Sequence, residues 1–157
     1  MQSRYLKLFV VIITILFVSC DRNRVFEQNQ KIEKGLWDMD QPVVITAVIT
    51  DTVNPHNVFI NFRNAGTYPF SNIFLFVNTR LPDGQMDRDT AEVLLATPEG
   101  KWMGKGLGDI WDNQVLFKQN VRFPKAGEYR FELTHAMRMN PLQGIMDVGM
   151  RVERVSN

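Results

Sequence analysis

Cysteine, histidine and serine are scarce in this chain of 157 residues. The single cysteine is Cys20, so an intrachain disulfide cannot form. The two histidines, His56 and His135, have no partner at a ligand-like spacing, which leaves no signal for a zinc site or a Cys–His catalytic pair. No serine lies in a Gly-x-Ser-x-Gly motif. We therefore predict that the protein is not an enzyme and uses no metal ion and no cofactor.

An excess of one charge is also absent. Eighteen Lys and Arg residues face seventeen Asp and Glu residues, and the formal net charge is +1. The basic residues are scattered singly, with no cluster beside aromatic residues that could stack bases. These features exclude nucleic acid as an expected partner. The hydrophobic fraction of 45% is that of an ordinary folded domain.

No apolar run is long enough for a permanent membrane span. The most apolar stretch, residues 8–18, would measure roughly 16 Å as a helix, against about 30 Å for the hydrocarbon core of a bilayer. It follows Arg4 and Lys7 and precedes Ser19, which is the order of a secretory signal. We predict that residues 1–19 are a signal peptide that is removed on export, with an uncleaved N-terminal anchor as the alternative.

Cys20 follows this segment directly. The sequence Phe17-Val18-Ser19-Cys20 resembles the bacterial lipobox, in which a small residue precedes a cysteine that becomes acylated, although Leu is usual where Phe17 stands. Lipidation explains a lone cysteine in an exported protein, and two or three acyl chains hold a protein durably at a membrane. We predict that Cys20 is lipidated and anchors the protein to a membrane; an unlipidated secreted protein is the alternative.

Short alternating apolar runs predict the fold of the mature chain. Residues 20–36 read as the lipidated cysteine and a polar tether, with a possible first strand near residues 25–28. From Trp37 on, apolar and polar residues alternate in runs separated by turn residues, and residues 43–50 are apolar enough on both sides to suggest a central strand. We predict turns at Asn64-Ala65-Gly66, Leu81-Pro82-Asp83-Gly84 and Thr97-Pro98-Glu99-Gly100. We predict an all-β domain over residues 37–157, an antiparallel β-sandwich of about seven or eight strands. A small closed barrel is the runner-up.

Glycines and lysines concentrate in residues 100–108, the glycine-rich loop. It is not a P-loop, because Gly106 rather than Ser or Thr follows Lys105. The simplest interpretation is a long loop with backbone positions that only glycine can take. An alternative makes it an interaction loop that uses Trp102 and Trp111, and another combines Trp37 with these two in an aromatic platform for sugars or proteins. The candidate interaction residues are Lys101, Trp102, Lys105 and Trp111.

Acidic residues give no convincing site. Asp83, Asp87 and Asp89 are close in sequence, but their spacing is not that of an EF-hand loop, and a solvated hairpin is the better interpretation. Glu128 and Glu132 fall on one expected strand, where nothing selects them as an acid and a base. We expect no small-molecule substrate.

Several sequence blocks, taken in order, resemble the gliding-motility lipoprotein GldH family of Bacteroidetes. The resemblance runs from the lipobox to near the C-terminus. The blocks are Phe62-Arg63-Asn64, Tyr68-Pro69-Phe70-Ser71-Asn72, the loop from Gly100 to Gly106, Phe123-Pro124, Gly127-Glu128-Tyr129, His135-Ala136-Met137-Arg138 and Gly144-Ile145-Met146-Asp147-Val148-Gly149.

The resemblance implies a membrane-anchored component of the gliding machinery and its associated protein secretion apparatus, which acts by protein–protein interaction with other envelope proteins. It supplies no catalytic or ligand residues. We expect the outer membrane with the domain facing the periplasm; the periplasmic face of the inner membrane is the alternative. The competing function is that of a carbohydrate-binding envelope lipoprotein.

Overall fold

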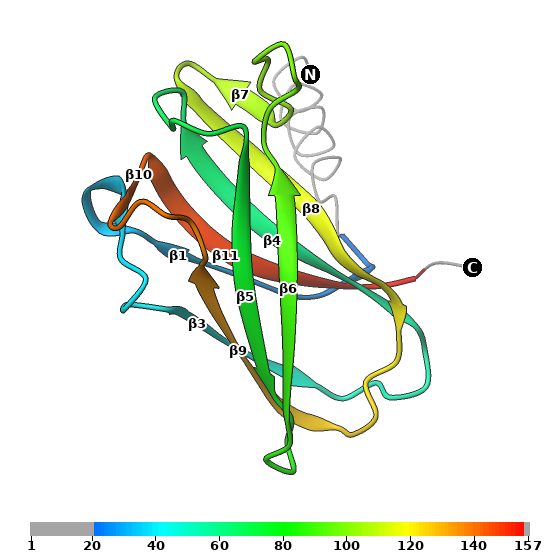
Figure 1. Ribbon diagram of the computed structural model, residues 1–157. Helices are drawn as coiled ribbons and strands as arrows, with labels where there is room; N and C mark the ends of the chain where they lie inside the picture. Colours follow the sequence, from blue (N-terminus) through cyan, green and yellow to red (C-terminus); the bar gives the residue numbers. More distant parts are fainter. Residues whose placement is uncertain (1–20, 156–157) are drawn as a thin grey trace, which may run out of the picture.

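Two antiparallel sheets pack face to face in the computed structural model, which describes residues 21–155 (Figure 1). One sheet has five strands in the order β1-β11-β4-β8-β7, the other has four in the order β3-β9-β5-β6, and β10 and β2 form a separate pair. The strands are β1 (Arg24–Lys31), β2 (Leu36–Trp37), β3 (Val43–Ile49), β4 (His56–Ala65), β5 (Asn72–Arg80), β6 (Met86–Leu94), β7 (Lys105–Leu107), β8 (Ile110–Val121), β9 (Gly127–His135), β10 (Leu142–Gln143) and β11 (Ile145–Arg154), with a short 3-10 turn, η1, at Glu33–Gly35.

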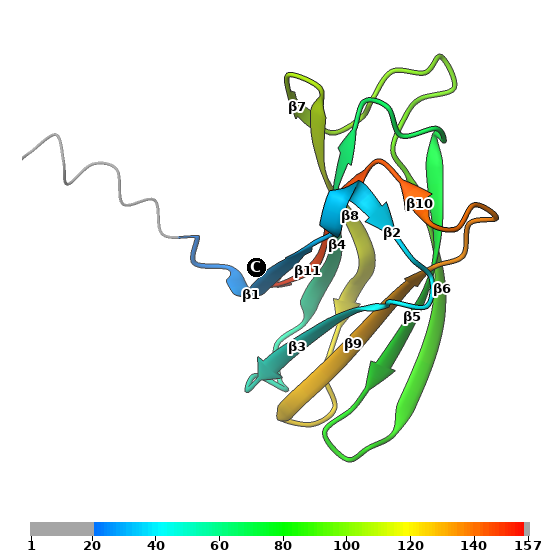
Figure 2. The same cartoon turned by 90° about the vertical axis from the view of Figure 1, so that its left-hand side faces the viewer.

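The predicted sandwich is confirmed. Among the described residues, eight strands are seven residues or longer, and the remaining three are short additions at the edges and ends. Figure 2 shows the two layers from the side, with β1 at the free edge of the five-stranded sheet. Strands β3, β4, β5 and β9 turn alternate side chains into the space between the sheets, as the period of two requires.

The core consists of these inward-facing rows. Val43, Ile45, Ala47 and Ile49 of β3 are all completely buried, and β4 contributes Val58, Ile60 and Phe62. The last long strand, β11, adds a third row of fully buried side chains, Val148, Met150 and Val152. Residues more than 100 positions apart in the sequence, such as Val43 and Val152, thus share one apolar interior.

The prediction that residues 43–50 form a central strand was wrong. β3 is the edge strand of the four-stranded sheet and pairs only with β9. Its outward-facing Val48 is 63% exposed. Valine on the wet face reflects the preference of β-branched side chains for extended backbone, not burial on both faces.

The segment expected to be a tether contributes a strand. β1 runs antiparallel to β11, with Gln28 opposite Met150 and Lys31 opposite Asp147. Arg151 of β11, with 12% of its side chain exposed, pairs with Asp21, with Glu27 at 2.7 Å and with Glu153 at 2.5 Å. The guanidinium side-chain hydrogen bond holds the pKa of Asp21 below its usual value. The folded part of the chain therefore extends to the first described residue.

The turns are built from the residues that the sequence indicated, with one exception. Gly84 and Gly100 have φ of +88° and +82°, and their amides donate to Leu81 and Thr97, so both proline-containing turns are confirmed. Gly66, in contrast, does not use a positive φ. Asn64, expected in that turn, lies at the end of β4, and its buried side chain accepts a hydrogen bond from Asn113 Nδ2 at 2.9 Å.

Both histidines are buried in this fold. His56 has no exposed surface, packs edge-to-face against Phe123 at 5.4 Å, and has no hydrogen-bond partner among residues 21–155 for either ring nitrogen. His135 Nε2 donates a hydrogen bond to the carbonyl oxygen of Trp37 at 3.0 Å. Burial lowers the pKa of both imidazoles, so the folded state favours their neutral forms.

We predict that the domain loses stability as the pH falls below about 6.5. In that range the histidines bind protons in the unfolded chain but stay neutral while they are buried in the folded domain. The free energy of unfolding therefore decreases, by at most about 1.4 kcal/mol per pH unit for each histidine. Urea unfolding at pH 7 and pH 5 measures this slope. The His56→Leu variant is expected to have a flatter profile, and an unchanged slope in that variant would contradict the prediction.

Candidate functional site

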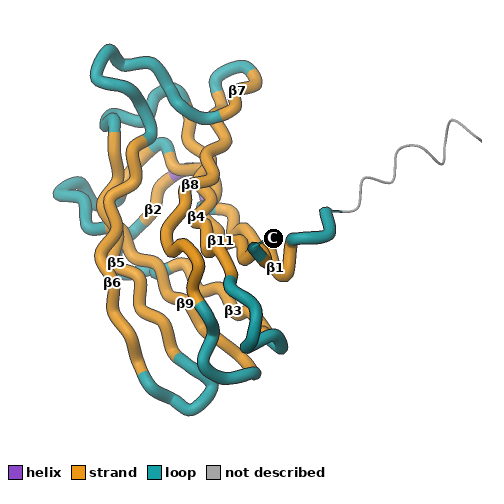
Figure 3. Tube along the Cα trace, turned by 90° about the vertical axis from the view of Figure 1, so that its right-hand side faces the viewer, coloured by secondary structure: helices purple, strands orange, loops and turns teal. Residues whose placement is uncertain are grey.

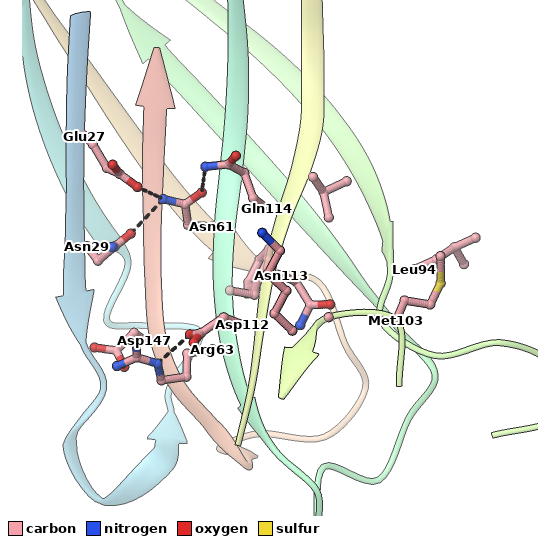
Figure 4. A pocket seen from close by; sticks show the side chains of 14 residues that line it. Glu27, Asn29, Asn61, Arg63, Leu94, Met103, Asp112, Asn113, Gln114 and Asp147 are labelled. Atoms are coloured by element: carbon pink, nitrogen blue, oxygen red, sulfur yellow. Dashed lines mark hydrogen bonds and ion pairs between the residues drawn. The ribbon is translucent and has the colours of Figure 1, made fainter. Parts of the chain in front are cut away.

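A polar groove of about 670 Å³ lies over the five-stranded sheet and reaches the glycine-rich loop (Figure 4). Strands β1, β4, β8 and β11 contribute its floor, while Met103, Gly104 and Lys105 line it from the loop and Leu94 from the end of β6. The polar floor residues occupy the positions that alternate with buried core residues, so they point away from the sandwich interior. They are Glu27, Asn29, Asn61, Arg63, Asp112, Gln114 and Asp147.

Asn61 stands at the centre of a hydrogen-bonded row across four strands. Its Nδ2 donates to Glu27 Oε1 at 3.0 Å and to Asn29 Oδ1 at 3.1 Å, and its Oδ1 accepts from Gln114 Nε2 at 3.3 Å. Figure 4 shows these four side chains meeting above the sheet. The contacts fix the amide orientations and leave further donors and acceptors facing the groove.

Glycine on the intervening strand makes this row possible. Gly149 of β11 lies opposite both Asn29 of β1 and Asn61 of β4. A Cβ atom added there would lie 1.9 Å from Asn29 Oδ1 and 2.4 Å from the carbonyl oxygen of Gln28. The Asn29 side chain, which bonds to Asn61, therefore occupies the space that any other residue at position 149 would fill.

Arg63 forms the second polar cluster of the groove. Its Nε donates to Asp112 Oδ1 at 2.6 Å, and its Nη1 lies 3.4 Å from Asp147 Oδ2. The hydrogen bond to Asp112 raises the pKa of Arg63 above its usual value, and Asp147 adds to the effect. With 48% of its side chain exposed, Arg63 presents a guanidinium held between two carboxylates to any molecule in the groove.

The four candidate residues of the glycine-rich loop region do not form one surface. Lys105 is exposed, lies opposite Asp112 in the β7–β8 pair and lines the groove. Lys101 is exposed outside the groove. Trp102 and Trp111 are partly buried, and the Nε1 atoms of both lie within 4 Å of a Cβ position at Gly66. The two tryptophans therefore anchor the loop, while Lys105 alone joins the groove.

Close packing explains the glycines of this loop. A Cβ at Gly106 would lie 2.4 Å from the ring of Trp111, its partner across the β7–β8 pair. A Cβ at Gly104 would lie 2.5 Å from the carbonyl oxygen of Asp112. Gly100 and Gly108 have positive φ, at 82° and 65°. This agrees with the simpler interpretation of the loop.

The remaining sequence candidates are dispersed. Trp37 is 1% exposed and packs edge-to-face on His135 at 5.3 Å, so it cannot join an exposed aromatic platform. Asp83 pairs with Lys125, and Asp89 pairs with Lys118 at 2.6 Å. Among residues 21–155, no three His, Cys, Asp or Glu side chains converge as a metal site, and no helix is long and apolar enough to span a membrane.

Sequence reasoning missed most of the groove. Asn61 and Arg63 alternate with the buried Ile60 and Phe62, so a polar outer face of β4 was visible in the sequence. The meeting of Asn61 with Glu27 and Gln114 was not, because these residues come from three separate strands.

The fold and the groove define the class of the protein, an all-β sandwich domain that offers a hydrogen-bonding surface on one outer sheet face. Residues 24–152 match the family model described as GldH lipoprotein. The chain belongs to the GldH lipoprotein family. As a member of a lipoprotein family, it is a membrane-anchored protein of the cell envelope.

Two relatives cover nearly the whole chain. The gliding motility lipoprotein GldH homolog of Christiangramia forsetii is 34% identical over 164 residues, with full coverage of both chains. The gliding motility lipoprotein GldH of Flavobacterium johnsoniae is 34% identical over 152 residues, with 92% of this chain and 94% of that protein covered. A solved structure, the VP2 subviral particle of infectious bursal disease virus, aligns with 82% of this chain and 30% of its own, at 12% identity and a TM-score of 0.34, which supports no conclusion.

We predict opposite outcomes for alanine at two glycines beside Trp111. Gly106→Ala forces its methyl group into the indole ring and is expected to destabilise the domain by about 1–3 kcal/mol. Gly66→Ala places a methyl group in ordinary contact, 3.6 Å from its nearest neighbour, and is expected to change stability little. Thermal unfolding with tryptophan fluorescence compares them, and equal losses would refute the packing explanation.

Proposed function

We propose that the chain is a lipid-anchored component of the gliding machinery and its associated protein secretion apparatus, and that it acts by protein–protein interaction. The observation that carries this proposal is the similarity, over nearly the whole chain, to proteins named gliding motility lipoprotein GldH. The function of those relatives is transferred here as a hypothesis about this chain.

The proposed anchor is Cys20, acylated after removal of residues 1–19. Both segments lie outside the described residues. We propose the outer membrane, with the domain facing the periplasm, as the location; the inner membrane, again on the periplasmic side, is the alternative. The membrane partner is reached through the acyl chains of Cys20.

The groove is the proposed contact surface for other envelope proteins. Its polar groups already hold one another, so a partner meets them in fixed positions and orders few side chains on binding. Leu94 and Met103 at its rim are 55% and 58% exposed and add apolar area. Four residues of the loop region remain proposed interaction residues: Lys101, Trp102, Lys105 and Trp111. Lys105 lines the groove directly, and the two tryptophans hold the loop backbone beside it.

The amide row also favours the second function, binding of carbohydrate. Asparagine, glutamine and carboxylate side chains in a shallow groove match the paired donors and acceptors of sugar hydroxyl groups. Glycan arrays with the lipidated protein distinguish the two functions. Specific glycan binding that Asn61→Ala abolishes would favour carbohydrate, and absence of binding would favour the protein partner.

We predict that Arg63→Glu impairs gliding or adhesin secretion in a strain that lacks the chromosomal gene. The substitution sets a third carboxylate beside Asp112 and Asp147 and makes the groove, which Glu27, Asp112 and Asp147 already make net negative, more negative still. Arg130→Glu is the matched control, since Arg130 has a similar exposure of 50% but lies on β9 in the other sheet. Surface spreading, the amount of secreted adhesin and the level of each protein variant are measured. If both variants are present at the same level and complement equally, the proposal that the groove is the contact surface is wrong.

We predict that Cys20→Ser removes the protein from the membrane fraction. Without the thiol no acyl chain can be attached, and metabolic labelling with an alkyne-tagged palmitate analogue should lose its signal. Mass spectrometry of the wild-type mature protein should show an acylated N-terminal cysteine. A free thiol at this position, or an intact Met1, would overturn the anchor.

A further inference from the structure

The first described residues are tied to the end of the five-stranded sheet. The Arg24 amide donates to the carbonyl oxygen of Asp21 at 3.3 Å, and the Arg154 amide donates to that of Asn23 at 2.7 Å. The Asp21 carboxylate pairs with Arg151, which Glu27 and Glu153 hold from two other sides. Asp21 is therefore part of the folded domain.

This attachment leaves almost no tether for a lipid anchor at Cys20. Consecutive Cα atoms are about 3.8 Å apart, so acyl chains on Cys20 would be linked to the chain only one residue before Asp21. Acyl chains on Cys20 enter the bilayer, and the part of the domain around Asp21 must then lie at the membrane surface. The inference rests on the proposed lipidation of Cys20.

Several strand ends meet at this place. His56, the first residue of β4, lies opposite Arg154 of β11 and Val121 of β8. The Val155 amide donates to the carbonyl oxygen of Pro55 at 3.0 Å, which brings the loop of residues 51–55 to the same end. We call residues 21–24, the loop 51–55, Arg122 and Arg154 the anchor end; in Figure 1 the described chain begins and ends on this right-hand side.

Exposed charge at the anchor end is mainly positive. Arg22 and Arg122 are exposed, and Arg24 and Arg154 have 50% and 49% of their side chains exposed. Asp21 has 40% of its side chain exposed but is paired with Arg151, and the other neighbouring acids are more withdrawn, since Asp51 has 15% of its side chain exposed and Glu153 has 24%. Glu27 pairs with Arg24 and Asp51 with Arg154, and the exposed parts of the arginine side chains can pair with phosphate groups.

An exposed apolar residue stands among these arginines. Val53 is 75% exposed, the highest value among the large apolar side chains described. Its loop is fixed by Asp51, whose Oδ1 accepts from the amides of Val53 at 3.1 Å and Asn54 at 3.0 Å. Arg122 Nε donates to the Val53 carbonyl oxygen at 3.1 Å. The loop is thereby held with valine projecting and a guanidinium beside it.

We propose that the anchor end docks on the membrane itself, with its arginines on anionic phospholipid headgroups and Val53 in the interfacial layer, so that the short anchor fixes the orientation of the domain. Basic residues with a neighbouring apolar side chain suit the headgroup region. At about 3.3 Å per residue, the ten residues of β4 carry the other end of the sheet roughly 30 Å away from the anchor end. Figure 3 shows β7 and its loop far from the start of β1, and this orientation presents them to envelope partners.

A single introduced thiol tests the orientation, because acylation blocks the only native cysteine. Val53→Cys and Met103→Cys are prepared as full-length lipidated protein, labelled with bimane and reconstituted into phosphatidylcholine vesicles with and without phosphatidylglycerol. Met103 is the matched control, an apolar side chain that is 58% exposed at the far end of the sheet. Quenching by a lipid with a nitroxide near its headgroup is measured.

We expect severalfold stronger quenching at position 53 than at position 103, increased further by phosphatidylglycerol. Adding Arg22→Glu and Arg122→Glu should remove the gain from anionic lipid, while Lys101→Glu with Arg138→Glu at the opposite end should leave it unchanged. Circular dichroism checks that each variant is folded. Equal quenching at both positions, or no effect of the paired arginine substitutions, would overturn the docking.

Vesicle flotation separates this inference from the proposed anchor. Protein that floats with vesicles yet leaves the label at position 53 unquenched contradicts only the docking, and the lipid anchor stands. Protein that fails to float contradicts the anchor, and the docking fails with it.

Discussion

Apolar contact between the two sheets is the interaction on which the rest of the structure depends. With one cysteine in the whole sequence, no disulfide can join the layers, and the described residues contain no metal-binding cluster. The inward rows of β3, β4 and β11 are buried almost completely. Because successive side chains of a strand point to opposite faces of the sheet, burying one row in the interior also fixes which residues face outward. The polar groove is formed by these outward-facing residues of the five-stranded sheet.

The form of the groove depends on two positions without a side chain as well as on contacts. Gly149 leaves the space in which Asn29 and Asn61 meet, and Gly106 leaves the space that Trp111 fills behind the glycine-rich loop. A surface of this kind needs close approach of strands and side chains more than it needs reactive groups. This agrees with a lipoprotein that works by contact, and the short link from β1 to Cys20 offers a physical reason why such a surface would be held in a constant direction.

Most of the fold was predictable because alternation and turn chemistry are local. The sandwich and the two Pro-Gly turns followed from residues that are neighbours in sequence. The place of β3 at an edge did not, since an outward valine has the same pattern in an edge strand and a central strand. The role of residues 24–31 was also underestimated, because these mostly polar residues resemble a tether. They form a strand that is held by its pairing with β11, near the other end of the chain.

By itself, the sequence predicted an export signal and a lipidated Cys20, and it determined the strand periodicity and the family resemblance, all of which depend on residues close together in the chain. Only the tertiary structure decided that Asn61 meets Glu27, that Arg63 lies between Asp112 and Asp147, and that Asp21 is bound to Arg151. The physical reason is the same in each case. These contacts join strands that are distant in sequence, and strand order is set by the packing of the whole core, which no local pattern specifies.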